Sequence, residues 1–384
     1  MTNNERWGTP LCSHSVTVHS WENRNLISDA PALIKLANGT LLCSVQLWSY
    51  DAFREDHDVL VDRLYGKNRC MIFASTDDGT TWTERGRIPF TTGKLLQHDS
   101  GLLFIGSGID WKGLYVARST DSGRTWSDPV RLRDGKVYAT ATGWVVQDET
   151  LYWAADDMSP SVENRAVFAF SCDLRKNPLD PGSWCFSNDE RHPGLPQCLG
   201  RGNHNGGKWL EPNVVNVDGT LLVIVRVRAS QESVDGVVPG IGAICDLTAT
   251  DERLQLNFSH YYPIPGAQNQ FHIIRDEAAG LFWMTSNQVT GKADDLYRGW
   301  GKERRFLMLH YSLDAQNWFP TGVLLMWPKE RQAYNYCSLL IDGEDLLVVS
   351  RTAENAKNQH DNDKITFHRF PDFRSTAVNL VPDK

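Results

Sequence analysis

One arrangement of residues recurs along the chain and restricts the fold more than any other feature. It consists of an apolar run, a short polar turn and a second apolar run. Asn-Gly and Asp-Gly pairs in these turns are typical of β-hairpin connections. Helical periodicity is nearly absent, so the apolar runs are predicted to be strands. Six copies occur: PALIKLANGTLLCSV (31–45), GKLLQHDSGLLFIGSG (93–108), ATGWVVQDETLYWAAD (141–156), PNVVNVDGTLLVIVRV (212–227), FHIIRDEAAGLFWMTS (271–286) and YCSLLIDGEDLLVVSR (336–351).

Each copy continues into further strand-like sequence, which indicates four strands per unit. Six four-stranded antiparallel sheets arranged radially form a β-propeller. The segment SHSVTVHSW (13–21) precedes the first unit, and we expect it to supply the outer strand of the last sheet and close the ring. No domain boundary is evident. The sequence therefore predicts an all-β fold, a single six-bladed propeller domain over residues 1–384.

A second repeat has the pattern Ser-x-Asp-x-Gly-x-Thr-Trp. It occurs as STDDGTTW (75–82) and STDSGRTW (119–126), with a shorter copy that lacks the glycine, SLDAQNW (312–318). Each copy follows a strand-like run. Asp can hydrogen-bond to its own backbone and Gly accepts a positive φ, which suits a tight turn. We expect these turns to be structural, with each tryptophan packed over the strands.

Composition excludes several classes of function. The net charge of -8 leaves no basic excess for nucleic-acid phosphates, and no apolar run reaches the length of a membrane span. The first residues, MTNNERWGTPLCSH, lack the basic start and apolar stretch of a signal peptide, so a cytoplasmic location is expected, or a secreted or periplasmic one if a signal was removed. The eight cysteines are scattered and interpreted as reduced thiols, with Cys172 and either Cys185 or Cys198 as the one plausible disulfide. Neither a metal site nor a cofactor is predicted, and the oligomeric state is left open.

Propeller geometry selects candidate site residues without any motif. The innermost strand of each sheet starts at the face that usually carries the site, and the second strand returns to that face. Polar groups that converge there indicate ligand binding rather than a purely structural ring. The starts of inner strands offer Asp29, Glu211, Asn213, Asn269, His272 and Tyr336; the ends of second strands offer Gln46, Trp48, Asp156, Asp157, Arg226, Arg228, Asn287 and Arg351; the loop after the sixth unit offers His360 and Asp361.

The turn pattern resembles the Asp-box, or BNR repeat, of sialidases and their relatives, which are six-bladed propellers. The stretch LEPNVVNVDGTLLVIVR is similar to the sialidase segment that supplies a glutamate and then an arginine, and Glu211 and Arg226 match these two. The stretch NYCSLLIDGEDLLVVSR is similar to the segment that begins with the sialidase nucleophile, which Tyr336 matches. The resemblance implies that Glu211 activates Tyr336 and that arginines bind a sugar carboxylate.

Two positions depart from the sialidase pattern. Asp29, in ISDAPALIKL, stands where sialidases have the first of their three arginines, and an acid there would repel the carboxylate. Arg351 stands where sialidases have an acidic residue. The chain is therefore not expected to be a typical sialidase. Its end, SRTAEN followed by HDNDKITFHRFPDFR (360–374), is similar to sialidase-like propellers of polysaccharide-degrading systems, some of which act on uronic-acid-containing glycans.

Two kinds of chemistry fit this face, with an oligosaccharide or polysaccharide as the partner. In hydrolysis, an acid protonates the glycosidic oxygen while another group attacks the anomeric carbon or activates water. Asp29, Asp156, Asp157, Glu211 and Tyr336 are the candidates. In β-elimination next to a uronate, Arg226 and Arg351 would neutralise the carboxylate while His272, His360 or Tyr336 transfers protons. The main hypothesis is a sialidase-like glycosidase acting on a terminal, acidic sugar; the alternatives are a polysaccharide lyase and a non-catalytic glycan-binding propeller.

Other candidates for substrate contact also have structural interpretations. Trp48 could stack on a sugar ring, whereas Trp82, Trp126 and Trp318 belong to the turns. His204, in the glycine-rich loop RGNHNGGKW, could reach over the site. Asn213 and Asn287 are expected to contact substrate, as are His360 and Asp361 unless they belong to a solvated loop or a weak calcium loop. The charged insertion SYDAFREDHDVLVDRLYGKN (49–68) is read as a loop over the site or as a plain surface excursion.

Overall fold

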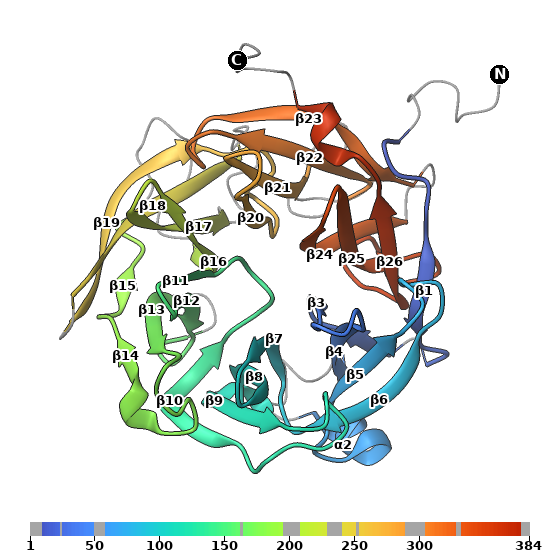
Figure 1. Cartoon of the computed structure of the whole chain (residues 1–384), viewed down its shortest axis with the longest axis horizontal. Coiled ribbons are helices and arrows are strands. Elements are labelled where there is room, and N and C mark those ends of the chain that lie inside the picture. The colour runs from blue at the N-terminus through green and yellow to red at the C-terminus, as the bar shows by residue number, and fades with distance from the viewer. Residues whose placement is uncertain are drawn as a thin grey trace.

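The computed structural model of the chain is a ring of β-sheets around a central cavity (Figure 1). It describes residues 10–23, 25–49, 58–161, 164–194, 208–228, 240–250, 253–288, 304–327 and 332–377. The predicted all-β propeller is confirmed. Among the described residues, no helix combines the length and the apolar character that crossing a membrane requires.

The strands form five hydrogen-bonded antiparallel sheets. The first contains β2 (Leu26–Ser28), β3 (Ala32–Lys35), β4 (Leu41–Ser49), β5 (Cys70–Ser75) and β6 (Thr83–Ile88). The second contains β7 (Thr92–His98), β8 (Gly101–Ser107), β9 (Lys112–Ser119), β10 (Val130–Tyr138), β11 (Val145–Gln147), β12 (Thr150–Asp157), β13 (Ala166–Asp173), β14 (Trp184–Phe186) and β15 (Glu190–Arg191).

The remaining three sheets have four strands each. They are β16 (Lys208–Val217), β17 (Thr220–Arg228), β18 (Ile241–Ala249) and β19 (Leu254–Pro263); β20 (His272–Asp276), β21 (Leu281–Asn287), β22 (Phe306–Ser312) and β23 (Trp318–Met326); and β24 (Ala333–Asp342), β25 (Asp345–Ala353) and β26 (Lys364–Phe370) with β1 (Val16–Ser20). Short helices are α2 (Val59–Tyr65), η2 (Ile109–Trp111), η3 (Pro181–Ser183) and η8 (Phe373–Thr376).

The prediction of six separate four-stranded sheets is wrong, because two of the six are joined. All six predicted strand pairs are present, and their innermost strands β3, β7, β11, β16, β20 and β24 line the central cavity. However, β10 pairs with β12 through Val137–Asp157 and Tyr138–Asp156, which joins β7–β10 and β11–β15 into one nine-stranded sheet. A long fourth strand reaches its neighbour here, a contact that strand periodicity does not reveal.

The ring closes as the sequence predicts, because β1 pairs antiparallel with β26. Val16 lies opposite Phe367 in this pairing, and Phe367 packs in the same apolar cluster as Val45 of the first sheet. Each apolar side chain buried in such a cluster contributes about 1.5–3 kcal/mol. The two ends of the described chain are therefore held by both backbone hydrogen bonds and a shared core.

The turn after β5 has the hydrogen bonds expected for its sequence. Ser75 Oγ donates to Asp77 Oδ1 (2.7 Å) and accepts from Gly79 N (2.8 Å), while Thr81 Oγ1 donates to Asp77 Oδ2 (2.7 Å). The turns after β9 and β22 centre on Asp121 and Asp314 in the same way. All three turns join the third and fourth strands of a sheet meander, so their role is structural.

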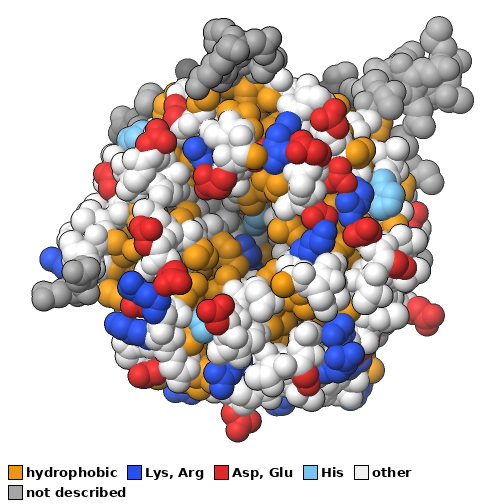
Figure 2. Space-filling view, viewed as in Figure 1, with side chains coloured by type: hydrophobic (Ala, Val, Ile, Leu, Met, Phe, Trp, Pro, Cys, Tyr) orange, Lys and Arg blue, Asp and Glu red, His pale blue; other side chains and the backbone are white. Residues whose placement is uncertain are grey.

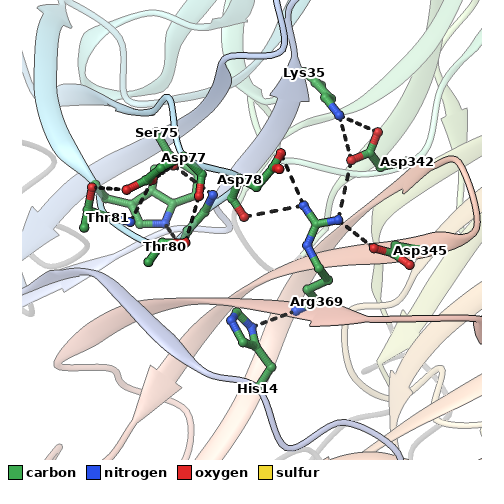
Figure 3. Close-up of polar contacts among 12 residues, drawn as sticks. His14, Lys35, Ser75, Asp77, Asp78, Thr80, Thr81, Asp342, Asp345 and Arg369 are labelled. Carbon is green, nitrogen blue, oxygen red and sulfur yellow. Dashed lines mark hydrogen bonds and ion pairs between the residues drawn. The ribbon is translucent and has the colours of Figure 1, made fainter.

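The first of these turns also touches the sheet that closes the ring. Figure 3 shows Asp78 beside Arg369 of β26, whose guanidinium lies 3.7 Å from the Asp78 carboxylate and 2.6 Å from Asp345. The Trp82 ring lies 5.4 Å from that of Phe367. The turn thus fixes the first sheet against the last.

Candidate functional site

Glu211 and Tyr336 occupy equivalent, unusual backbone positions on two innermost strands. Glu211 has φ +55° and Tyr336 has φ +50°, in the left-handed region that costs a non-glycine residue about 1–2 kcal/mol. In both strands the pairing register shifts at this point, between Leu210 and Asn213 in β16 and between Asn335 and Ser338 in β24. Bulges of this kind re-aim side chains next to functional sites. The structure therefore distinguishes the two residues that the sialidase resemblance singled out.

Glu211 is held by two buried contacts. Its carboxylate accepts from Arg226 Nη1 at 2.5 Å, and both side chains are at most 3% exposed. Its backbone N–H donates to Asp156 Oδ1 (2.8 Å), and Asp156 is in turn paired with Arg165 at 2.7 Å. Burial raises the pKa of Asp156 to about 7, against the opposing effect of Arg165. Asp156 thus anchors the strained backbone at Glu211.

Arg226 connects Glu211 to Tyr336. Its Nε donates to the carbonyl of Gln268 (3.1 Å), and its guanidinium interacts with both the Glu211 carboxylate and the Tyr336 hydroxyl. Burial alone would lower the pKa of Arg226, but these two partners outweigh it and the pKa is raised. The cation therefore stays charged beside the tyrosine hydroxyl.

His360 and Asp361 approach Tyr336 from the loop before β26. The Tyr336 hydroxyl lies 3.5 Å from His360 Nε2, and His360 Nδ1 lies 2.9 Å from Asp361 Oδ1. Burial, aided by the Arg351 and Arg304 cations, lowers the pKa of His360 although Asp361 opposes it. A neutral imidazole that donates through Nδ1 to Asp361 presents Nε2 as an acceptor. The tyrosine hydroxyl can donate to it.

Two more arginines lie against the Tyr336 ring. The guanidinium carbons of Arg351 and Arg304 are 4.6 Å and 5.0 Å from the ring centroid. Among the described residues, Arg304 Nε and Nη1 and Arg351 Nη2 have no hydrogen-bond partner, although both side chains are almost fully buried. Burial lowers the pKa of Arg304 to about 10, and the neighbouring arginines add to this. Unpartnered cationic donors of this kind can bind an anion.

Asp29 completes the buried charges of this region. Its Oδ1 accepts from the backbone N–H of Ala30 (2.8 Å) and from the Tyr138 hydroxyl (3.0 Å). Burial raises the pKa of Asp29, although the Arg351 cation opposes it. The two departures from the sialidase pattern, Asp29 and Arg351, are thus electrostatic neighbours of opposite sign. The predicted repulsion of a sugar carboxylate by Asp29 is offset by the cation beside it.

Other residues that were predicted to contact substrate form structural hydrogen bonds or pack in the core. Asn213 of β16 bridges the segment before β11 and the strand β20, because its Oδ1 accepts from Gly143 N (2.7 Å) and Ile273 N (3.1 Å). Asn287 donates to the carbonyls of Arg304 and Tyr334 (3.1 and 2.8 Å). Both amides thus make structural bridges among the described residues. Trp48 packs in a buried cluster with Ile27, Trp111, Tyr138 and Met158, 6.0 Å from the Arg351 guanidinium.

His272, which the sequence offers for catalysis, contacts the strand that carries Tyr336 three residues farther along, at Leu339. Its Nδ1 accepts from Leu339 N (3.4 Å), and its side chain lines the central cavity together with the hairpin turns of the opposite face. The β20–β21 pairing contains no bulge that would re-aim it. His204 lies outside the described residues, as does part of the insertion 49–68.

Sequence reasoning missed Arg304, Tyr138 and Arg165. Arg304 lies in the loop just before Arg305 and the third strand β22, whereas only starts of first strands and ends of second strands were considered. The pair of arginines before the apolar run FLMLHY was the available signal.

No group of three or more His, Cys, Asp or Glu residues suited to a metal ion is found in the described ranges. The described cysteines are free thiols.

No protein-family model and no curated protein sequence matches the chain. Among solved structures, it is similar to the alpha-L-arabinanase of Penicillium chrysogenum complexed with arabinobiose, with 14% identity, a TM-score of 0.59, and coverage of 95% of this chain and 99% of that one. It is also similar to the alpha-L-arabinofuranosidase of Fusarium graminearum complexed with an iminosugar inhibitor. Here the identity is 13% and the TM-score is 0.60, with coverage of 94% of this chain and 98% of that one. Similarity to the Trypanosoma rangeli sialidase in complex with sialic acid extends over 94% of this chain and 60% of that one, with 15% identity and a TM-score of 0.57. These likenesses show that the fold is a sialidase-like β-propeller.

Proposed function

We propose that the chain is a glycoside hydrolase that removes a terminal, acidic sugar from an oligosaccharide or polysaccharide. The observation that carries this proposal is Tyr336, held in a strained backbone conformation among Arg226, Arg304 and Arg351. Cations around a tyrosine stabilise the charge that develops on its oxygen when it loses a proton. The solved structures with this fold that are named above are glycosidases, which supports the same reaction class.

An acidic sugar fits the unpaired arginine donors. Arg304 and Arg351 present N–H groups without partners among the described residues, and a planar guanidinium binds a carboxylate through two parallel hydrogen bonds. A buried cation without a counter-charge is costly, and a substrate carboxylate would offset that cost. Furthermore, a phenol nucleophile has no fixed charge, so it avoids the repulsion that a carboxylate nucleophile would meet from an anionic sugar.

The proposed reaction begins with attack by Tyr336 Oη on the anomeric carbon. The glycosidic C–O bond breaks, and the leaving oxygen takes a proton from Asp29, whose raised pKa favours the acid form. The tyrosine proton passes to His360 Nε2 or to Glu211, the two groups linked to the hydroxyl directly and through Arg226. Water then attacks the anomeric carbon and gives its proton to Asp29, the glycosyl–tyrosine bond breaks, and the tyrosine oxygen recovers its proton from His360 or Glu211, which regenerates the enzyme.

A polysaccharide lyase is the second candidate, because Tyr336, His360 and Asp361 form a hydrogen-bonded series next to arginines. In β-elimination the arginines would stabilise the uronate carboxylate while the tyrosine and histidine transfer protons. The hydrolase is preferred because it uses the Glu211–Arg226 pair and the bulged backbone at both Glu211 and Tyr336.

The test is a turnover screen on sialosides, glucuronides, galacturonides and arabino-oligosaccharides, followed by reducing-end assay and ultraviolet absorbance. Tyr336→Phe should lower kcat at least about 10³-fold, the loss expected when a nucleophile is removed. Tyr334→Phe is the matched control, because this hydroxyl lies on the same strand and its ring stacks on Trp327. Near-native turnover by Tyr336→Phe would refute the role of this residue.

A second variant tests the acidic sugar separately. Arg304→Met should raise KM for an acidic substrate more than for a neutral arabinoside, whereas any loss of kcat from weaker stabilisation of the Tyr336 oxygen should be common to both substrates. Turnover of neutral glycans alone would refute the carboxylate site but retain the hydrolase. Reducing ends that appear together with absorbance would establish the lyase, and glycan binding without any turnover would establish a binding propeller.

A further inference from the structure

The central cavity is separate from the candidate site. It has a volume of about 650 Å³ and opens toward the hairpin turns around Asp218 and Glu277, whereas Glu211 and Tyr336 lie at the other ends of the inner strands. Figure 2 looks into the hollow at the centre of the ring, where blue and pale-blue side chains are visible on its wall. Much of the lining is apolar.

Lys94 of β7 is the buried cation of this cavity. Its side chain is 6% exposed, its ammonium donates to the carbonyl of Thr142 (2.6 Å), and it lies 4.1 Å from the centroid of the Trp144 ring. No carboxylate among the described residues pairs with it. One carbonyl and one ring leave at least one ammonium N–H without an acceptor. Burial lowers the pKa of Lys94 to about 7.

His272 supplies a second unpaired donor. Its Nδ1 accepts from Leu339 N, so in the neutral ring the proton is on Nε2. Nε2 is buried and has no partner among the described residues, and His272 is 2% exposed. The Lys94 charge acts on His272, after burial as the main cause, to lower the pKa of the imidazole. The two donors therefore lie within electrostatic reach of each other on the wall of one cavity.

We propose that the central cavity binds a small monovalent anion, a halide or the carboxylate of a small molecule, between Lys94 Nζ and His272 Nε2. A buried ammonium and a buried imidazole N–H that both lack acceptors favour an acceptor with negative charge. The charged residues at the mouth, Arg275, Asp218 and Glu277, are farther toward solvent, and Arg275 lies 3.9 Å from Glu277. Apolar residues that also line the cavity, such as Ile273 and Leu339, could contact the carbon skeleton of a carboxylate ligand.

The experiment measures anion binding directly and does not depend on any glycosidase activity. Sodium bromide, sodium acetate and sodium glucuronate are titrated into the full chain by calorimetry. Crystals soaked in bromide are examined for an anomalous peak between the two nitrogens. Lys94→Met and His272→Leu should each weaken binding at least tenfold. Lys35→Met is the control, because Lys35 follows Ile34 on the neighbouring inner strand, is paired with Asp342, and should leave binding unchanged.

Each outcome decides the proposal. Bromide binding that depends on Lys94 supports a halide site, and binding of acetate or glucuronate with the same dependence supports a carboxylate site. Titrations in which the native chain and Lys94→Met coincide, or crystals without a bromide peak at these nitrogens, overturn it. If Lys94→Met fails to fold, His272→Leu provides the same comparison.

Discussion

The left-handed backbone at Glu211 allows a quantitative test of the strain at the candidate site. Glycine adopts φ +55° at no steric cost, whereas alanine pays about 1–2 kcal/mol there. An alanine-to-glycine change also loses one buried methyl group and increases the entropy of the unfolded chain. These two losses occur at any buried strand position, so a reference position on the same strand removes them from the comparison.

Val214 is that reference. It lies on β16, is 1% exposed, and is not among the residues with positive φ. Four variants are needed: Glu211→Ala, Glu211→Gly, Val214→Ala and Val214→Gly. Because removal of Glu211 would leave Arg226 buried without its counter-charge, at a cost of about 3–5 kcal/mol, all four are made in an Arg226→Met background.

The free energy of unfolding is measured by urea titration with tryptophan fluorescence. We expect the step from alanine to glycine to be more favourable at position 211 than at 214 by about 1–2 kcal/mol, the cost of the left-handed conformation. Equal m-values would show that the variants unfold to the same extent. If the two steps agree within about 0.3 kcal/mol, the bulge does not impose strain on Glu211. Tyr336→Ala and Tyr336→Gly repeat the test at the equivalent position of β24.

Two further predictions concern the turn after β5. The hydrogen bonds from Thr81 and Ser75 lower the pKa of Asp77 to about 2, so the carboxylate stabilises the fold above its unfolded pKa and this contribution is lost as pH falls from about 4 toward 2. Asp77→Asn should flatten the Tm–pH curve in that window, and an unchanged curve would refute the assignment. Gly79→Ala should destabilise by about 1–3 kcal/mol, because its Cβ would lie 2.1 Å from Phe367 Cε1 at φ +88°. Gly39→Ala, with φ +85° and open space, isolates the backbone cost, and equal losses at both positions would contradict the packing argument.

The sequence predicts the strands well because each pair carries its own local signal. In the stretch 212–227, two apolar runs flank Asp218–Gly219, and the structure has the strands β16 and β17 with the turn at that point. The closing strand was also predictable, since an isolated strand before the first hairpin requires a partner at the other end of the chain. The merging of two meanders through β10 and β12 was not predictable, because it depends on the reach of one long strand in three dimensions.

The candidate site was predicted in part, and the bulges explain which part. Glu211 and Tyr336 reach the cluster because the backbone is left-handed there; propeller geometry and the resemblance to sialidases both indicated these residues, but neither indicated the bulges. His272 starts an inner strand in the same way but has no bulge, so it lines the central cavity instead. Arg304 escaped notice because a loop residue before a third strand has no periodic signal for its direction.

The charges around Tyr336 explain how the chain can depart from the sialidase pattern at two positions together. An acid at position 29 alone would place a buried carboxylate where sialidases have a cation. An arginine at position 351 alone would add an uncompensated cation near Arg226 and Arg304. Together the two changes keep the sum of the formal charges, and the Arg351 cation opposes the rise that burial causes in the pKa of Asp29. Compared with the sialidase pattern, the cation at position 29, just before the inner strand β3, is absent, and a cation at position 351 on β25 of the neighbouring sheet is present instead. Three arginines, Arg226, Arg304 and Arg351, therefore still lie beside the tyrosine, which is the arrangement that the proposed carboxylate ligand requires.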